Sequence, residues 1–129
     1  VEISSGKDVS IIATGIMVEK AIKAKEMLAV EGISARVINI HTIKPIDKDI
    51  IIKAAKETKA IVTAEEHNII GGLGSAVAEV IAENYPVPLK RIGVKDTFGE
   101  SGKPEELLKK YELTENDIVK AAKVLKNCF

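Results

Sequence analysis

Tryptophan is absent from this chain of 129 residues, and aromatic residues make up only 3% of it. The core must therefore be built from aliphatic side chains, and 46% hydrophobic residues are enough for one packed core. Cores of Ile, Val, Leu and Ala are typical of parallel sheets that are covered by helices. The length is close to that of one domain, so we expect residues 1–129 to form a single domain.

The chain also has little cysteine, no excess of charge and no long apolar run. Cys128 is the single cysteine, which excludes an internal disulfide and is typical of a cytoplasmic protein. Lys plus Arg number 19 and Asp plus Glu number 19. This balance predicts no nucleic-acid partner and no anionic membrane partner. No apolar run approaches the roughly 18 residues that a membrane span needs.

Strand-like and helix-like patterns alternate along the chain. Short apolar runs predict buried strands, and apolar residues at helical spacing predict the helices between them. Asp47 is the expected N-cap of the second helix, and Thr114 with Asp117 resembles a capping box at the last helix. The least apolar strand, 89–94, is expected at a sheet edge. The expected strands are 2–5, 9–14, 35–40, 60–64 and 89–94. The expected helices begin near Met17, Asp47, Leu73, Pro104 and Thr114. The apolar stripe of the second helix is expected to consist of Ile50, Ile51, Ala54 and Ala55.

This alternation is typical of an open, mostly parallel sheet with helices on both faces. Right-handed crossovers would place strands 35–40 and 60–64 on opposite sides of strand 9–14. Ligands of such sheets bind in a crevice outside the carboxyl ends of the strands. We therefore expect a crevice at the ends of strands 9–14 and 60–64, lined by residues 14–15 and 65–74.

A glycine cluster precedes the third helix and is a candidate anion site. Gly71, Gly72 and Gly74 would leave backbone N–H groups free near Ser75, where the helix dipole favours a phosphate or a carboxylate. The spacing does not match a dinucleotide fingerprint, because Val77 stands where the third glycine is needed. The simpler interpretation, which we favour, is a tight turn with close packing of the helix on the sheet.

Two acids and a histidine follow the apolar run 60–64, and they are candidates for acid–base chemistry or metal binding. His67 lies directly after Glu65 and Glu66 in the chain, and imidazole and carboxylate groups are common proton carriers and metal ligands. His41 is the only other histidine, so the evidence for a metal site is weak. The simpler interpretation is that His67 forms a hydrogen bond locally or at an interface.

Three segments, in this order, resemble the C-terminal domain of transketolase. Residues 41–47 (HTIKPID) resemble its "TIKPLD" segment, residues 63–77 its "TxExH…GGxGxAV" block and residues 101–108 its "SGKPxELL" block. The resemblance runs from about Gly6 to Val124. Related blocks occur in other thiamine-diphosphate enzymes, including 1-deoxyxylulose-5-phosphate synthase and the beta subunits of 2-oxoacid dehydrogenases. The segments "TIKP" and "SGKP" together favour transketolase, especially its split bacterial and archaeal forms and its animal type.

The resemblance implies a three-layer α/β/α fold whose five-stranded, mostly parallel sheet has one antiparallel edge strand, residues 2–5. It also implies a part in an enzyme of the pentose phosphate pathway that moves a two-carbon ketol unit between sugar phosphates with thiamine diphosphate and Mg²⁺ or Ca²⁺. The family's coenzyme-binding motifs are absent from this chain, so we expect no catalytic, cofactor-binding or metal-binding residue here. The implied partners are the N-terminal and pyrimidine-binding domains of a homodimer or heterotetramer.

The candidate interface or anion site consists of Glu66, His67, Gly71, Gly72, Gly74 and Ser75. Three functions stay open for it. The chain is a domain that packs on the rest of an enzyme, a regulatory module that binds an anionic metabolite near residues 72–75, or a small enzyme that uses His67 and Glu66. Because the first residue is Val1 and not Met, we expect a fragment or a split subunit of a larger enzyme.

Overall fold

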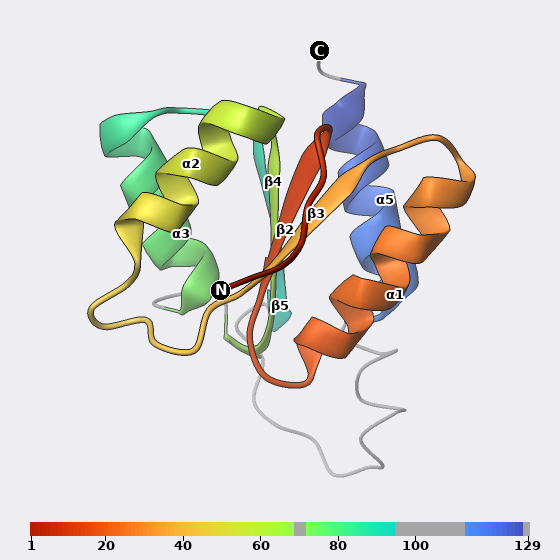
Figure 1. Ribbon diagram of the computed structural model, residues 1–129. Helices are drawn as coiled ribbons and strands as arrows, with labels where there is room; N and C mark the ends of the chain where they lie inside the picture. The colour runs from red at the N-terminus through yellow and green to blue at the C-terminus, as the bar shows by residue number, and fades with distance from the viewer. Residues whose placement is uncertain (69–71, 95–112, 128–129) are drawn as a thin grey trace, which may run out of the picture.

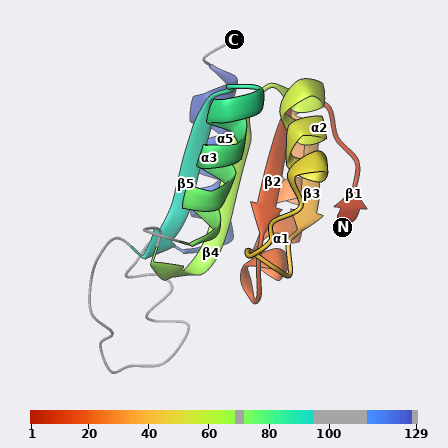
Figure 2. The same cartoon turned by 90° about the vertical axis from the view of Figure 1, so that its left-hand side faces the viewer.

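A five-stranded sheet lies between two layers of helices (Figure 1). The computed structural model describes residues 1–68, 72–94 and 113–127. In chain order the elements are β1 (Glu2–Ser4), β2 (Val9–Ala13), α1 (Met17–Val30), β3 (Ala35–Asn39), α2 (Lys48–Thr58), β4 (Ile61–Asn68), α3 (Leu73–Asn84), β5 (Leu89–Val94) and α5 (Glu115–Lys126). Helices α1 and α5 cover one face of the sheet, and α2 and α3 cover the other face, which lies towards the viewer in Figure 2. The helix expected after Pro104 and the thiol of Cys128 lie outside the described residues.

The strand order is β1-β3-β2-β4-β5. Strand β1 pairs with β3 in antiparallel orientation, and the other neighbouring strands are parallel. The central strand β2 therefore lies between β3 and β4, with Ile11 opposite Val37 on one side and Val62 on the other. This arrangement confirms the predicted fold class, the antiparallel edge strand and the edge position of β5.

The core consists of two apolar layers, one on each face of the sheet. All five residues of β2 are buried, because this strand has neighbours on both sides and helices on both faces. Its alternate side chains enter different layers: Ile11 and Ala13 pack with α1 and α5, and Ile12 packs with α2 and α3. The aliphatic composition thus fills both layers of the fold, as expected for a mostly parallel sheet.

Helix α2 has the predicted N-cap, but its buried face differs by one residue from the expected stripe. The Asp47 side chain accepts a hydrogen bond from the Ile50 backbone N–H at 3.3 Å, which confirms the cap. Ile50 is only half-buried, whereas Thr58 is buried with Ile51, Ala54 and Ala55. The Thr58 hydroxyl is 2.7 Å from the Ala54 carbonyl oxygen and 2.6 Å from the Ser10 hydroxyl. These hydrogen bonds satisfy a polar group on a face that an apolar pattern alone does not identify.

The last helix, α5, begins as predicted. The Thr114 side chain accepts a hydrogen bond from the Asp117 backbone N–H, and the Asp117 side chain accepts one from the Thr114 backbone N–H. This pair is a capping box with Asp in place of the usual Glu or Gln. It fixes the start of a helix whose residues Ile118, Ala122 and Leu125 are buried against the sheet layer shared with α1.

Replacing Gly6 by alanine is expected to destabilise the fold. A Cβ at Gly6 would lie 2.2 Å from the carbonyl carbon of Ala35 and 2.4 Å from the backbone nitrogen of Arg36. Backbone atoms of β3 cannot move away without disturbing its pairing with β1 and β2. We expect Gly6→Ala to lower the free energy of unfolding by about 2 kcal/mol or more, measured by urea denaturation.

The control is Gly32→Asn. Gly32 also has no side chain, but a Cβ at this position would have nothing within 4 Å, and its φ is +78°, which Asn tolerates better than most residues. We expect this variant to lose no more than about 1 kcal/mol, which comes from the left-handed backbone alone. Equal losses in the two variants would contradict the close approach at Gly6.

Candidate functional site

Strand β4 is longer than the sequence predicts, and this decides where the two acids point. The expected strand ended at Ala64, but β4 continues to Asn68, so Glu65 and Glu66 are strand residues. Successive side chains of a strand point to opposite faces. Glu65 accordingly reaches the α3 side of the sheet, and Glu66 reaches the α1 side.

The Glu65 carboxylate binds the start of α3. One carboxylate oxygen, Oε1, accepts a hydrogen bond from the Leu73 backbone N–H at 2.9 Å, and Oε2 accepts one from the Gly74 backbone N–H at 2.7 Å. Glu65 is 1% exposed. The first backbone N–H groups of a helix have no partner inside the helix, and the helix dipole favours a negative charge there. Glu65 is therefore a buried, charged cap that joins β4 to α3.

Glu65 occupies two backbone donors at the helix start where the sequence predicts an anion site. The backbone N–H groups of Leu73 and Gly74 are the donors that a helix start offers to a phosphate or carboxylate, and here both bind Glu65. An external anion could use these two donors only by displacing a buried carboxylate from the same chain. A ligand site in this part of the molecule must therefore rely on other groups.

Gly74 allows α3 to approach the sheet closely. A Cβ at this position would lie 2.9 Å from Cδ of Arg91 and 3.1 Å from the hydroxyl oxygen of Thr63. The Thr63 side chain is fully buried, and its hydroxyl has no hydrogen-bond partner among the described residues. The close approach supports the simpler interpretation of the glycine cluster, in which glycine permits tight packing of helix on sheet.

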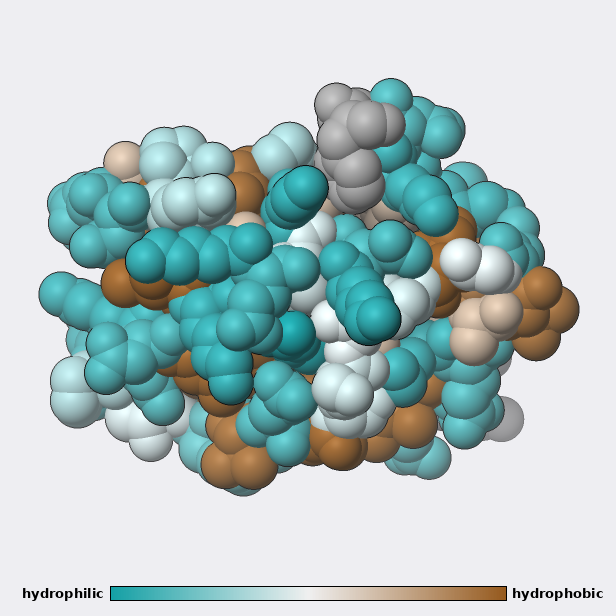
Figure 3. Space-filling view, turned by 45° about the horizontal axis from the view of Figure 1, so that its top comes forward, coloured by the Kyte–Doolittle hydropathy of each residue, from teal (hydrophilic) through white to brown (hydrophobic). Residues whose placement is uncertain are grey.

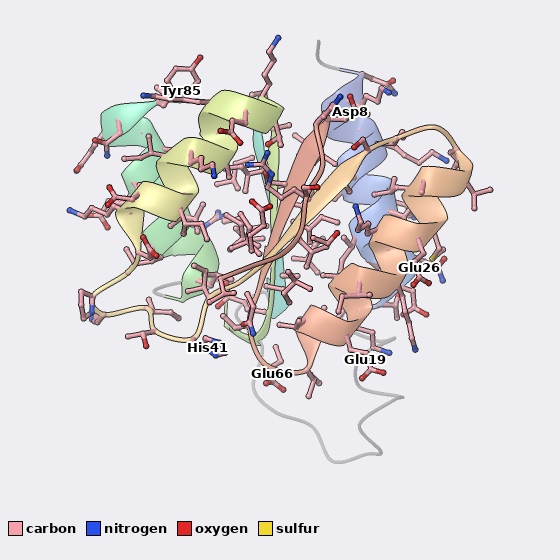
Figure 4. All side chains as sticks on the ribbon, viewed as in Figure 1. Asp8, Glu19, Glu26, His41, Glu66 and Tyr85 are labelled. Atoms are coloured by element: carbon pink, nitrogen blue, oxygen red, sulfur yellow. The ribbon has the colours of Figure 1, made fainter. Side chains whose placement is uncertain are left out.

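Glu66 lies against the turn between β2 and α1. A Cβ at Gly15 would be 2.6 Å from Oε1 of Glu66, and Gly15 has a φ of +57°, which glycine adopts without strain. Glu66 is half-buried. Figure 4 shows Glu66, His41 and Glu19 at the same end of the molecule, where β2 and β4 end. Glu66 thus occupies part of the edge where the sequence predicts a crevice.

The other predicted site residues lie in different surroundings. Gly72 is the N-cap of α3, with extended backbone, and Ser75 is half-buried in the first turn of the helix. His67 belongs to β4, its side chain lies outside the described part, and Gly71 lies outside the described residues. His41 is exposed, with Nε2 3.4 Å from Nδ2 of Asn39.

The sequence predicts that Glu65 lines the crevice, but it does not identify Glu65 as the cap of α3. The cap is missed because the acids are expected to follow the strand and not to belong to it. The signal is present in the alternation of β4: Ile61, Thr63 and Glu65 share a face, and Ile61 packs in the α2–α3 layer. A carboxylate on that face, followed by a helix start, predicts a cap.

The described residues do not form a metal centre or a membrane span. Within 1–68, 72–94 and 113–127, no group of three or more His, Cys, Asp or Glu side chains could hold a metal ion. In the same ranges, no helix has the length and apolar character needed to cross a membrane.

Comparisons with known proteins agree on one family. The family model "Transketolase, C-terminal domain" matches residues 1–118. The 6-deoxy-6-sulfo-D-fructose transketolase subunit SqwH of a Clostridium strain is 54% identical over 117 residues, which are 91% of this chain and 36% of that protein. The 1-deoxy-D-xylulose-5-phosphate synthase of Heliobacterium modesticaldum is 42% identical over 121 residues, 93% of this chain and 19% of that protein.

A solved structure shows the same fold. It is described as a split gene transketolase in an inactive beta4 tetramer, and it is 51% identical to this chain with a TM-score of 0.95. The match covers 98% of this chain and 42% of the other. The chain thus spans about a third of the SqwH subunit and less than half of the solved chain.

We expect the Glu65→Gln variant to be less stable than the natural chain. The amide would keep the shape of the side chain, but it would remove the charge and place an NH₂ group against one of the two backbone donors. Because hydrogen bonds to charged groups contribute about 1.5–3 kcal/mol each, we expect a loss of at least about 1.5 kcal/mol in the free energy of unfolding. Urea denaturation measures it.

Glu66→Gln is the matched control, because it is the same change in the adjacent residue. No backbone hydrogen bond to Glu66 joins it to a helix start in the described part of the chain, so we expect a loss below about 0.5 kcal/mol. A Glu65→Gln variant as stable as Glu66→Gln would show that the cap contributes little.

Proposed function

The chain belongs to the transketolase C-terminal domain family, and from this premise we propose that it is the C-terminal domain of a transketolase, without catalytic activity of its own. It packs on the coenzyme-binding domains and supports assembly of the active enzyme. The observation that carries the proposal is the match to the family over residues 1–118. Transfer of a two-carbon ketol unit between sugar phosphates is the proposed activity of the whole enzyme, of which the chain is one part.

The hydrogen bonds of the buried Glu65 carboxylate support a structural role for this residue, and not a catalytic one. The most deeply buried carboxylate among the described residues, Glu65, places both oxygens on backbone N–H groups of α3. A catalytic acid or base needs to reach the proton that it transfers, whereas this carboxylate is enclosed by its own fold. Its geometry suits a residue that positions a helix.

The described residues do not suit thiamine diphosphate. Its diphosphate requires a metal ion and anion-binding donors. Among these residues, no three His, Cys, Asp or Glu side chains lie together in a way that could hold a metal ion, and the Leu73 and Gly74 donors bind Glu65. We therefore derive no catalytic step through the coenzyme in this chain. In the proposal, the N-terminal and pyrimidine-binding domains hold the coenzyme together with Mg²⁺ or Ca²⁺.

We place the packing surface at the end of the sheet where β2 and β4 end. Ile16 is 49% exposed in the turn before α1, next to Gly15 and its contact with Glu66. We base this placement on the exposed Ile16 beside the half-buried Glu66 carboxylate, because interfaces combine apolar and polar groups. The opposite end of the molecule, seen in Figure 3, is mostly hydrophilic, with separate hydrophobic areas. His67 and Gly71 remain candidates for the same surface, since they follow Glu66 in the chain.

The relatives favour a transketolase over the synthase. The SqwH subunit is 54% identical to this chain, and the synthase of Heliobacterium modesticaldum is 42% identical. The SqwH name gives 6-deoxy-6-sulfo-D-fructose as the sugar of that enzyme. We therefore propose two candidate pathways for the whole enzyme: the pentose phosphate pathway and one that uses a sulfosugar, as the SqwH name indicates for that protein. We further propose that the whole enzyme is a cytoplasmic homodimer or heterotetramer.

Reconstitution tests the proposal. The chain is mixed with the coenzyme-binding portion of the same enzyme, and complex size and ketol transfer are measured. We expect a complex and a rise in activity. Ile16→Ser should raise the dissociation constant at least about tenfold, because burial of an Ile side chain contributes about 1.5–3 kcal/mol. Ile16 is exposed and belongs to neither apolar layer of the core, so the fold should persist.

Val30→Ser is the matched control. Val30 is 89% exposed at the other end of α1, and its replacement should leave the dissociation constant unchanged. The packing proposal fails if the natural chain forms no complex and does not change the activity. The placement of the surface fails if Val30→Ser weakens the complex as much as Ile16→Ser does.

A further inference from the structure

A groove of about 370 Å³ opens between residues 43–48 and α3. The loop that leads into α2 lies beside α3 in both Figure 1 and Figure 2. Pockets of about 300–1,000 Å³ are typical of small-molecule sites. The lining residues are Ile43, Lys44, Ile46, Lys48, Gly72, Ser75, Ala76, Glu79, Val80, Glu83 and Asn84.

Two isoleucines and two lysines of the segment before α2 line one side of the groove. Ile43 and Ile46 are half-buried, so each presents part of an aliphatic side chain to the groove. Lys44 and Lys48 are exposed in the same segment. In the part of the chain that the structure describes, neither lysine has an ion pair or a hydrogen bond from its ammonium group. Two exposed lysines that line a groove attract a phosphate or a carboxylate.

Two carboxylates lie on the α3 side of the groove. Glu79 and Glu83 are exposed and four residues apart, so they occupy the same face of the helix, with about 5–6 Å between their Cβ atoms. They too have no ion-pair partner among the described residues. A carboxylate accepts hydrogen bonds and repels a second anion. This side therefore favours a ligand portion that is uncharged and rich in hydroxyl groups.

We propose that the groove is a binding site for a phosphorylated polyhydroxy compound. The phosphate lies at Lys44 and Lys48, the carbon chain lies on Ile43, Ile46 and Val80, and hydroxyl groups donate hydrogen bonds to Glu79 and Glu83. A compound with anions at both ends does not fit, because one end would face the two carboxylates. A free phosphate uses only the lysine side. The donors at Leu73 and Gly74 stay with Glu65, so this site differs from the anion site expected at the helix start.

The proposal does not depend on the role of the chain in a transketolase. It requires only a groove, two classes of charged group and an apolar floor, all of which belong to this chain. A failed reconstitution would not contradict the ligand site. A negative result for the ligand site would not contradict the packing proposal.

The test is an NMR titration of the complete ¹⁵N-labelled chain with sorbitol 6-phosphate. We expect saturable shifts of backbone amide signals in residues 43–48 and 72–84. Sorbitol and inorganic phosphate, which are the two halves of the probe, should each bind at least about tenfold more weakly. The proposal is overturned if no saturable shift occurs up to about 10 mM probe, if the shifts lie elsewhere, or if inorganic phosphate binds as tightly as sorbitol 6-phosphate.

Two double variants separate the two sides of the groove. Lys44→Ala with Lys48→Ala should weaken binding of sorbitol 6-phosphate at least about tenfold. Glu79→Ala with Glu83→Ala should reduce the preference for sorbitol 6-phosphate over inorganic phosphate, because the hydroxyl groups lose their acceptors while the apolar contacts remain. All four side chains are exposed, so the fold should persist, and the amide spectrum itself reports it.

Lys90→Ala with Lys120→Ala is the matched control for charge. Both lysines are exposed, and they lie on β5 and α5. This variant removes the same charge as the lysine variant of the groove but should bind the probe unchanged. Equal weakening in the two lysine variants would show a general effect of net charge and would overturn the site.

Discussion

The contact between the Glu65 carboxylate and the backbone of Leu73 and Gly74 is the interaction on which this part of the molecule depends. It joins the end of a central strand to the start of the next helix through a buried charge. A buried carboxylate is costly unless hydrogen bonds satisfy it, and helix N–H groups are costly if they are buried without a partner. Each group satisfies the other, so the contact stabilises this relative position of the two elements.

The placement of α3 follows from this contact. With the first turn bound to β4, Gly74 brings the helix within contact distance of Thr63 and Arg91, and Val77 and Ile81 enter the apolar layer shared with α2. The outer face of the helix, with Glu79 and Glu83, then lines the groove beside residues 43–48. The contact thus positions both the core of this layer and the surface that we propose as a ligand site.

Much of the fold is accessible from the sequence, because simple periodicities control it. The buried run of β2, the cap at Asp47 and the capping box at Thr114 are local patterns, and the sequence predicts all three. It does not predict the extension of β4 through Glu65 and Glu66, since charged residues normally mark the end of a buried strand. Nor does it predict the groove, because the groove depends on how the loop before α2 packs beside α3. Only tertiary structure brings those distant segments together.

Hydrogen exchange at the Leu73 and Gly74 amides tests the central contact most directly. Amides in the first turn of a helix lack partners within the helix and usually exchange quickly. If Glu65 binds them as described, both should exchange as slowly as amides in the middle of α3, such as that of Val80. Fast exchange at Leu73 and Gly74, with slow exchange at Val80, would show that the helix start is open to solvent and would contradict the account.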